Sequence, residues 1–207
     1  MKHLYLNRAP GATQGFTIVE LLVVVALLGV LAAIAIPMAQ PAISGYEIAG
    51  QAHAVAYDIS LAKMQGASGF TQSRLYVNLG NNSYHIESWN NTTQAWTTQG
   101  AVTSLPSGMG FGFGTLGTPP PNTQSTIGQA PACTTKCAGC VGSTPIASTS
   151  CVLFNSRGTP IDSTGTPFAS DALYLTDGRA VYGVAVSLAG LTQLWWTPTW
   201  NTAWQKQ

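Results

Sequence analysis

The four cysteines are the residues whose spacing could support the most specific chemistry. They follow the pattern Cys133-x3-Cys137-x2-Cys140, with Cys151 further along the chain. The first three match the spacing of thiolates that bind an iron–sulfur cluster, and four thiolates could also hold zinc. Both of these sites need reduced thiols. An even number of cysteines in an exported domain is more typical of disulfides, so we expect two disulfides, with three pairings open.

The carboxylate of Glu20 stands alone in a strongly apolar segment. It is the only ionisable side chain from Phe16 to Ala39. A charged side chain costs about 2.5–3.5 kcal/mol at the centre of a bilayer and less near the interface, so a counter-charge is expected. A cut between Gly15 and Phe16 would create an α-amino group four residues before Glu20. That is the helical spacing that places both groups on one face.

Aromatic side chains gather at the end of the chain, beside one basic residue. Such side chains can stack on the bases of single-stranded nucleic acid. Tryptophans more often pack on a sheet or against another subunit, and we favour that interpretation. The candidates for subunit contact, or for DNA contact as the alternative, are Trp195, Trp196, Trp200, Trp204 and Lys206.

Other catalytic or binding chemistry is sparse. His53 and His85 lie in no recognisable metal or triad motif, and the acidic residues are scattered. The 207 residues include only eight Lys or Arg and seven Asp or Glu, with a net charge of +1. A general electrostatic affinity for nucleic acid or anionic lipid is therefore not expected. The sequence predicts a structural protein rather than an enzyme, with no cofactor and no metal.

The apolar segment at residues 16–39 is the element that must position Glu20. A helix of this length can cross a bilayer, which takes about 20 residues. An ordinary secretory signal would share the basic start, with Lys2 and Arg8, and the small residues at Ala33–Ala35. Neither that interpretation nor a plain single-span anchor explains Glu20. A buried core helix of a soluble domain explains neither the length nor the uniformity of the segment.

A known processing signal is similar to this N-terminal pattern. The class III signal of type IV pilins and type II secretion pseudopilins resembles Gly15-Phe16-Thr17, Glu20 and the run from Leu21 to Pro37. The resemblance implies that prepilin peptidase cuts after Gly15 and methylates the new N-terminal Phe16. It implies that Glu20 meets an N-terminal amine during assembly. The implied partners are other pilins or pseudopilins, prepilin peptidase, the inner-membrane assembly platform and the membrane.

The helix is expected to continue beyond the apolar run. Pro37 and Pro41 each remove a backbone donor, so we expect a kink there. An apolar stripe at helical spacing follows, and it should cover the sheet of a head domain. A glycine-rich stretch at residues 66–69 suits the end of the helix. The stripe consists of Ile48, Ala52, Val55, Ile59 and Ala62.

Strand patterns follow the helix. Residues 74–79 and 83–89 predict a β-hairpin, with a third short strand at 95–97. Runs rich in β-branched and aromatic residues predict further strands, and Asp177-Gly178 and Ala189-Gly190 mark tight turns between them. The order predicts an α+β fold, in which a long N-terminal helix, transmembrane in one half and amphipathic in the other, packs on an antiparallel β-sheet head. The later strands are expected at 151–154, 172–175, 180–186 and 192–196.

A late motif narrows the resemblance. The segment Leu153-Phe154-Asn155-Ser156-Arg157-Gly158, followed by a hairpin, resembles the GspH/FimT group of minor pilins and pseudopilins. Some FimT-like minor pilins capture DNA, and the resemblance would call for basic residues in the final hairpin. Its turn at residues 187–193 contains no Arg or Lys, which counts against DNA binding.

These observations predict a structural minor pilin or pseudopilin of a type IV pilus or type II secretion pseudopilus. We expect a single-pass inner-membrane protein with a periplasmic head, later incorporated into the filament. The alternatives are a DNA-binding minor pilin and a membrane-anchored protein that binds a metal or cluster through its cysteines. The expected parts are a cleaved leader at 1–15, a transmembrane and assembly helix at 16–39, the amphipathic half of the stalk helix at 40–66, and a β-rich head at 67–207 with a Gly/Pro/Ser/Thr-rich, Cys-containing insertion at 106–150.

Overall fold

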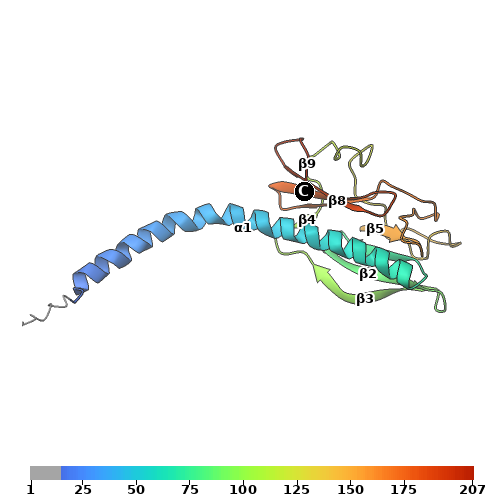
Figure 1. Cartoon of the computed structure of the whole chain (residues 1–207), viewed down its shortest axis with the longest axis horizontal. Helices are drawn as coiled ribbons and strands as arrows, with labels where there is room; N and C mark the ends of the chain where they lie inside the picture. Colours follow the sequence, from blue (N-terminus) through green and yellow to red (C-terminus); the bar gives the residue numbers. More distant parts are fainter. Residues whose placement is uncertain (1–14) are drawn as a thin grey trace, which may run out of the picture. The chain divides into compact units, whose positions relative to one another are not determined.

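A computed structural model describes residues 15–207, apart from the side chains of residues 37 and 39–42. One helix, α1 (Ile18–Ser68), is followed by nine β-strands (Figure 1). The chain divides into two compact units between Ile43 and Ser44, so that α1 contributes to both. Each unit is described by itself below.

The second half of α1 belongs to the head and buries the predicted stripe. All five stripe residues have no exposed surface, which confirms the sequence prediction. They pack in one core with residues from two sheets, including Leu75, Phe154, Leu173 and Val184. Because the apolar side chains recur every three or four residues, a single face of the helix can supply all of them. The buried face consists of Ile48, Ala52, Val55, Ile59 and Ala62.

The end of α1 is fixed by its backbone. The Thr71 N–H donates to the Gly66 carbonyl at 3.2 Å, the long-range bond of a Schellman cap. Phe70 occupies the left-handed position of that cap, with φ of 49°. Glycine is usual there because a side chain makes this conformation costly. The side chain of Phe70 is 85% exposed.

The first sheet has the strand order β3-β2-β1-β5 and is antiparallel throughout. The predicted hairpin is confirmed, since Arg74 lies opposite Glu87 and Asn78 opposite Ser83. The third strand is longer than predicted, and a register shift interrupts its pairing to β2. Its strands are β1 (Ser73–Asn78), β2 (Ser83–Asn90), β3 (Ala95–Ser104) and β5 (Thr149–Phe154).

The second sheet has the order β4-β6-β7-β8-β9, also antiparallel. The sequence analysis expects one sheet, whereas the head contains two. The physical reason is that β5 returns to the edge of the first sheet beside β1, so the later strands pair among themselves. The strands are β4 (Gly110–Phe111), β6 (Ala172–Thr176), β7 (Ala180–Val186), β8 (Thr192–Pro198) and β9 (Gln205–Lys206).

The segment between β4 and β5 is held to the sheets by individual polar contacts. The side-chain amide of Gln129 donates to the Tyr174 carbonyl and accepts from its N–H, both at 2.9 Å, as a neighbouring strand would. The Ala130 N–H donates to the Ala172 carbonyl at 2.7 Å. This long polar insertion therefore lies along β6 without forming a regular strand of its own.

Candidate functional site

The proposed cleavage point lies just before α1. Gly15, Phe16 and Thr17 are outside the helix and exposed, with 79% of Phe16 accessible. Exposed non-helical chain is where proteolysis concentrates. The peptide bond between Gly15 and Phe16 is thus accessible to a protease. Residues 1–14, the remainder of the expected leader, lie outside the described residues.

Thr17 caps the first turn of the helix. Its Oγ1 accepts a hydrogen bond from the Glu20 backbone N–H at 3.2 Å, and its carbonyl accepts from the Leu21 N–H at 3.1 Å. Thr-x-x-Glu is the spacing of a capping box, and a carboxylate in the first turn interacts favourably with the helix dipole. The capping role of Thr17 is not among the features predicted from the sequence. Glu20 therefore helps to begin the helix.

The predicted pairing of Glu20 with an amine at position 16 remains a prediction. α1 begins at Ile18, so Phe16 is not part of the helix in the uncut chain. The ion pairs in the described part of the chain involve Arg74, His85 and Glu87, and not Glu20. The amine arises only after cleavage. The predicted counter-charge for Glu20 is the amine of the processed end or of a neighbouring copy.

The segment Ile18–Ile36 is the one helix in the described chain that is long and apolar enough to cross a membrane. None of it is buried within the protein. A helix that is apolar on all sides, with no internal partner, belongs in lipid or among other helices. At 1.5 Å per residue its length is close to the roughly 30 Å of a hydrocarbon core.

The expected kink at Pro37 and Pro41 is not tested. The helix runs without interruption through both positions. Their side chains lie outside the described residues.

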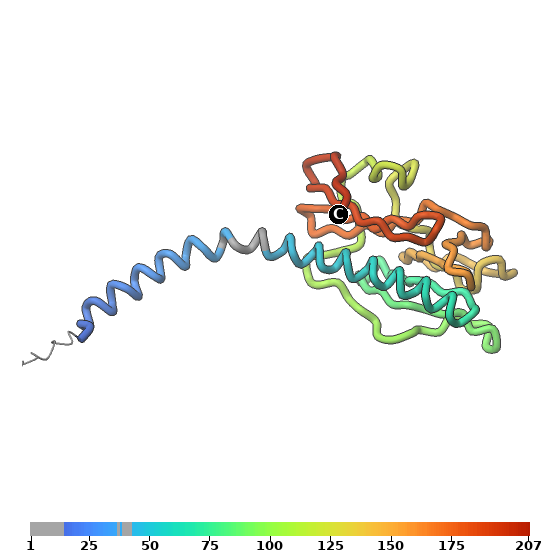
Figure 2. Tube along the Cα trace, in the orientation of Figure 1, coloured from blue at the N-terminus to red at the C-terminus, as the bar shows by residue number. Residues whose placement is uncertain are grey.

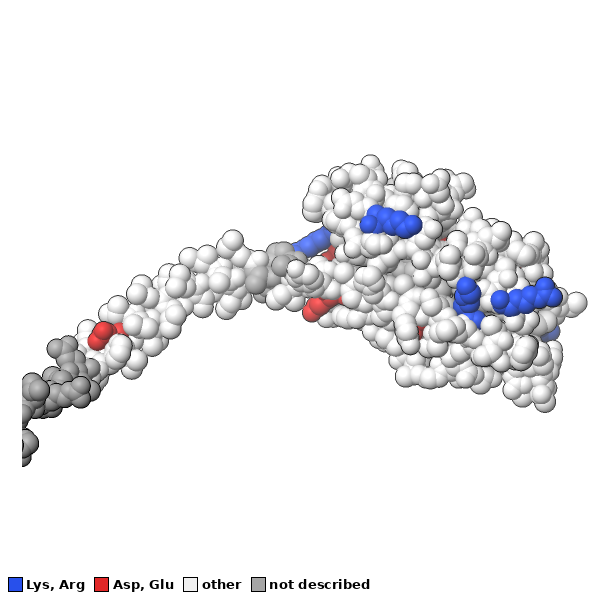
Figure 3. Space-filling view, viewed as in Figure 1, with Lys and Arg blue, Asp and Glu red and all other residues white. Residues whose placement is uncertain are grey.

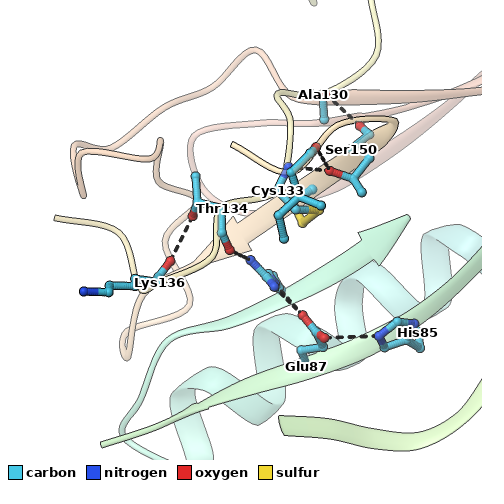
Figure 4. The surroundings of a disulfide bond; sticks show 11 residues. His85, Glu87, Ala130, Cys133, Thr134, Lys136 and Ser150 are labelled. Carbon is cyan, nitrogen blue, oxygen red and sulfur yellow. Dashed lines mark hydrogen bonds and ion pairs between the residues drawn. A yellow bond between two sulfur atoms is a disulfide. The ribbon is translucent and has the colours of Figure 1, made fainter. Parts of the chain in front are cut away.

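All four cysteines form disulfides, which closes the choice among three pairings. Cys133 bonds to Cys151 on β5, and Cys137 bonds to Cys140. The first bond joins residues 18 apart and fastens the insertion to the first sheet, as Figure 4 shows. Paired sulfurs are not thiolates, so in this state they bind neither zinc nor a cluster. The described residues contain no group of three potential metal ligands among His, Cys, Asp and Glu.

A buried ion pair between β1 and β2 contacts the loop that contains Cys133 (Figure 4). The Arg74 Nε and Nη2 each lie 2.6 Å from Glu87 Oε2, and Nη1 donates to the Thr134 carbonyl at 2.7 Å. The guanidinium also stacks on Trp96, 4.0 Å from the ring centroid. Burial lowers the pKa of Arg74, and the negative charge of Glu87 opposes that shift. The sequence contained this signal, since the hairpin register places Arg74 opposite Glu87.

Asp171, immediately before β6, is a second buried ionisable residue beside Arg74. Only 2% of it is exposed, and its Oδ1 has no hydrogen-bond partner. It borders a small cavity of about 20 Å³ that Arg74, Cys133 and Asp162 also line. That volume can hold one water molecule. Burial, with a smaller contribution from the charge of Asp162, raises the pKa of Asp171 to about 7.

The tryptophan-rich end packs on the second sheet, apart from one residue. Trp196 stacks on Tyr182, and Trp195 lies opposite Lys206, whose Nζ is 5.8 Å from the ring centroid. The Trp204 Nε1 donates to the Thr118 carbonyl, which joins the C-terminal segment to the loop after β4. Figure 2 shows the backbone of these two segments side by side. Trp200 alone is widely exposed, at 82%.

This arrangement does not favour a nucleic-acid surface. A channel for single strands needs several exposed aromatic faces beside positive charge. On the face shown in Figure 3 the Lys and Arg side chains are few. The positions that the sequence analysis considers for DNA contact are thus mostly occupied by packing within the head.

One comparison with known proteins concerns the N-terminal segment. Residues 12–36 match the family described as the prokaryotic N-terminal methylation motif. No curated protein matches the chain. Among solved structures, the chain is similar to the minor pseudopilin EpsH from the Type 2 Secretion System of Vibrio cholerae, with 12% identity over 70% of this chain and 92% of that chain and a TM-score of 0.41. The matched residues carry the methylation motif and contain the predicted cleavage point, Glu20 and most of the apolar run.

Proposed function

We propose that this protein is a structural subunit of a type IV pilus or type II secretion pseudopilus, of the GspH/FimT-like minor type. The observation that carries the proposal is the exposed apolar half of α1, which follows a methylation motif and contains a single carboxylate. Such a helix is stable in lipid before assembly and among other helices afterwards. The subunit acts by packing, and its role requires no catalytic residue.

Processing prepares the subunit for assembly. Prepilin peptidase cuts after Gly15, and Phe16 becomes the methylated N-terminus. As subunits leave the bilayer on the assembly platform, the Glu20 carboxylate meets an N-terminal amine. This pairing matters because an unpaired charge among packed apolar helices is strongly unfavourable. Capping by Thr17 keeps the first turn of the helix formed up to Glu20.

The membrane orientation follows from charge and from the disulfides. Lys2 and Arg8 precede the apolar run, and positive residues favour the cytoplasmic side of a membrane. The head then lies in the periplasm, where disulfides persist. Cys133–Cys151 and Cys137–Cys140 suit that compartment.

The test replaces Glu20 and compares two fractions of the native cell. Glu20→Leu should leave the amount of protein in the membrane unchanged and reduce the amount in sheared filaments at least about tenfold, because the amine loses its partner. Val19→Leu is the matched control, since it changes an adjacent apolar residue and should assemble normally. Normal incorporation of the Glu20→Leu protein would contradict the proposed function.

A further inference from the structure

The outer strand edges of the two sheets differ in whether other segments of the chain cover them. The outer edge of β5 is covered, because the Cys151 N–H donates to the Pro131 carbonyl at 2.8 Å and the Ile161 N–H to the Leu153 carbonyl at 2.9 Å. The Cys133–Cys151 disulfide holds this cover in place. Proteins commonly close such edges because unpaired strand edges recruit other strands.

The second sheet is closed at both sides by short strands. β4 pairs with β6 over two residues, and Gln129 and Ala130 continue the cover along that strand. On the other side, β9 pairs with Trp195 and Trp196 of β8, and the Gln207 N–H donates to the Leu194 carbonyl at 2.9 Å. The strands left outermost, β4 and β9, are two residues long each.

The outer edge of β3 has no such cover in the described part of the chain. Its only strand partner is β2, the Thr97 carbonyl also accepts a long hydrogen bond of 3.4 Å from the Gln99 side chain, and nine of its ten residues are exposed. It contains neither a charged residue nor a proline, the two commonest protections of an edge. No charged residue occurs anywhere between Glu87 and Lys136. The register shift and Gly100, with φ of 78°, disrupt only the second half of the strand.

The first half of β3 remains a regular edge of five residues. Ala95 to Gln99 pair continuously with Asn90 to Ile86 of β2. A hollow of about 330 Å³ adjoins this half and is lined by Thr97 and Gln99 together with uncharged residues of β2, of the turn after β2 and of the segment after α1. In strand addition, backbone hydrogen bonds provide affinity and such hollows accept alternate side chains of the added strand.

We propose that this edge pairs with the same edge of a second copy of the chain. A second copy offers β3 as its one long uncovered edge among the described strands. Antiparallel pairing of the two five-residue halves about their midpoints places Thr97 opposite Thr97 of the other copy. Charges on the edge would face like charges in such a symmetric pair and oppose it, and this edge carries none.

Membrane anchoring makes a short edge sufficient for this pairing. Two chains in one bilayer meet at a higher effective concentration than two soluble heads. The inference rests on the anchoring in the proposed function but not on the filament. It describes a paired form of the subunit in the membrane, in which the heads join through one continuous eight-stranded sheet made of two four-stranded sheets.

A cysteine test distinguishes the two halves of the strand. The full chain is reconstituted in vesicles of phosphatidylethanolamine and phosphatidylglycerol and then oxidised. Thr97→Cys should give at least about fivefold more disulfide-linked dimer than Thr103→Cys, a matched threonine on the same exposed strand beyond the register shift. Equal yields at the two positions would overturn the pairing.

A second measurement avoids any change in the cysteines. Donor- and acceptor-labelled full chains are mixed in the same vesicles, and energy transfer reports the pair. Thr97→Lys should abolish the transfer because like charges then face each other, whereas Thr97→Val should retain it. Flotation of the vesicles reports anchoring separately. Two results would overturn the inference if the chain floats with the vesicles: no energy transfer between unaltered chains, or energy transfer that Thr97→Lys does not change. Either result would leave the proposed function untouched.

Discussion

The two halves of α1 have the same secondary structure and opposite surroundings. In the first half, apolar side chains face outward all around the helix, and Leu31 is 63% exposed. In the second half, one stripe is fully buried against the sheets and Ile59 has no exposed surface. The difference shows that the second half obtains its partner from its own chain, whereas the first half has to find one in lipid or in other subunits.

The apolar half of α1 and the head also differ in the surroundings of their carboxylates. Glu20 is exposed at the beginning of the helix, where Thr17 caps the first turn. Asp171, in the head, is buried with one oxygen unpartnered. An exposed acid remains available for a counter-charge from outside, and a buried acid tends to keep its proton. The exposed position of Glu20 suits the proposed role in assembly. The buried position of Asp171 concerns the stability of the head.

The largest expected effect is a difference in the free energy of unfolding between substitutions in the two halves of α1. Ile59→Ala should lower the free energy of unfolding of the head by about 4 kcal/mol, because it leaves a cavity in a fully packed core. Leu31→Ala should leave it unchanged. Urea titration of the full chain in detergent micelles measures both, and all six tryptophans follow residue 88, so their fluorescence reports the head. Equal losses would remove the distinction between the halves.

The next effect concerns the disulfide that covers β5. Replacing Cys133 and Cys151 with serine should lower the free energy of unfolding by about 3 kcal/mol, since the bond closes a loop between residues 18 apart. The same change at Cys137 and Cys140, three residues apart, should cost about 2 kcal/mol. The titration described above compares the two variants. A greater loss of stability from replacing Cys137 and Cys140 would show that the segment held to β5 by Cys133–Cys151 is not the stabilising contact.

Asp171 should make the head less stable as the pH rises. Its folded pKa of about 7 lies above its ordinary value of 3.8, so the folded head binds the proton more tightly than the unfolded chain. Stability is then greatest below about pH 4 for this group and falls until about pH 7. Asp171→Asn should remove that slope and raise stability at pH 8 by about 2 kcal/mol. Unfolding titrations from pH 4 to 8 measure it, and a slope retained in the variant would refute the assignment.

The smallest expected effect is at the end of the helix. Phe70→Gly should raise the free energy of unfolding by about 1 kcal/mol, because glycine adopts the left-handed conformation without strain. The exposed ring has little packing to lose. Gly69→Ala serves as a control, since Gly69 does not have a positive φ and should not gain from the change. A destabilised Phe70→Gly head would show that the ring packs within the head.

Local patterns predicted much of this fold. The buried stripe of α1, the first hairpin and the late strands depend on periodicity and turn residues that neighbouring positions provide. The capping box at Thr17 and the pair of Arg74 with Glu87 were also local enough to be found, the first from its spacing and the second from the hairpin register.

Long-range features were not predictable in the same way. Three cysteine pairings were open because spacing does not specify which sulfurs meet. The division into two sheets depends on β5 returning to β1 across a long polar insertion. The burial of Asp171 likewise arises from segments far apart in the chain, and its position before a strand gave no sign of it.

The central claim is that the apolar half of α1 becomes an assembly helix through a cut immediately before it. Mass spectrometry of the native polypeptide tests this most directly. The account predicts a chain that begins at N-methylated Phe16. A native chain that still carries residues 1–15, or one cut downstream near Ala35, would contradict it.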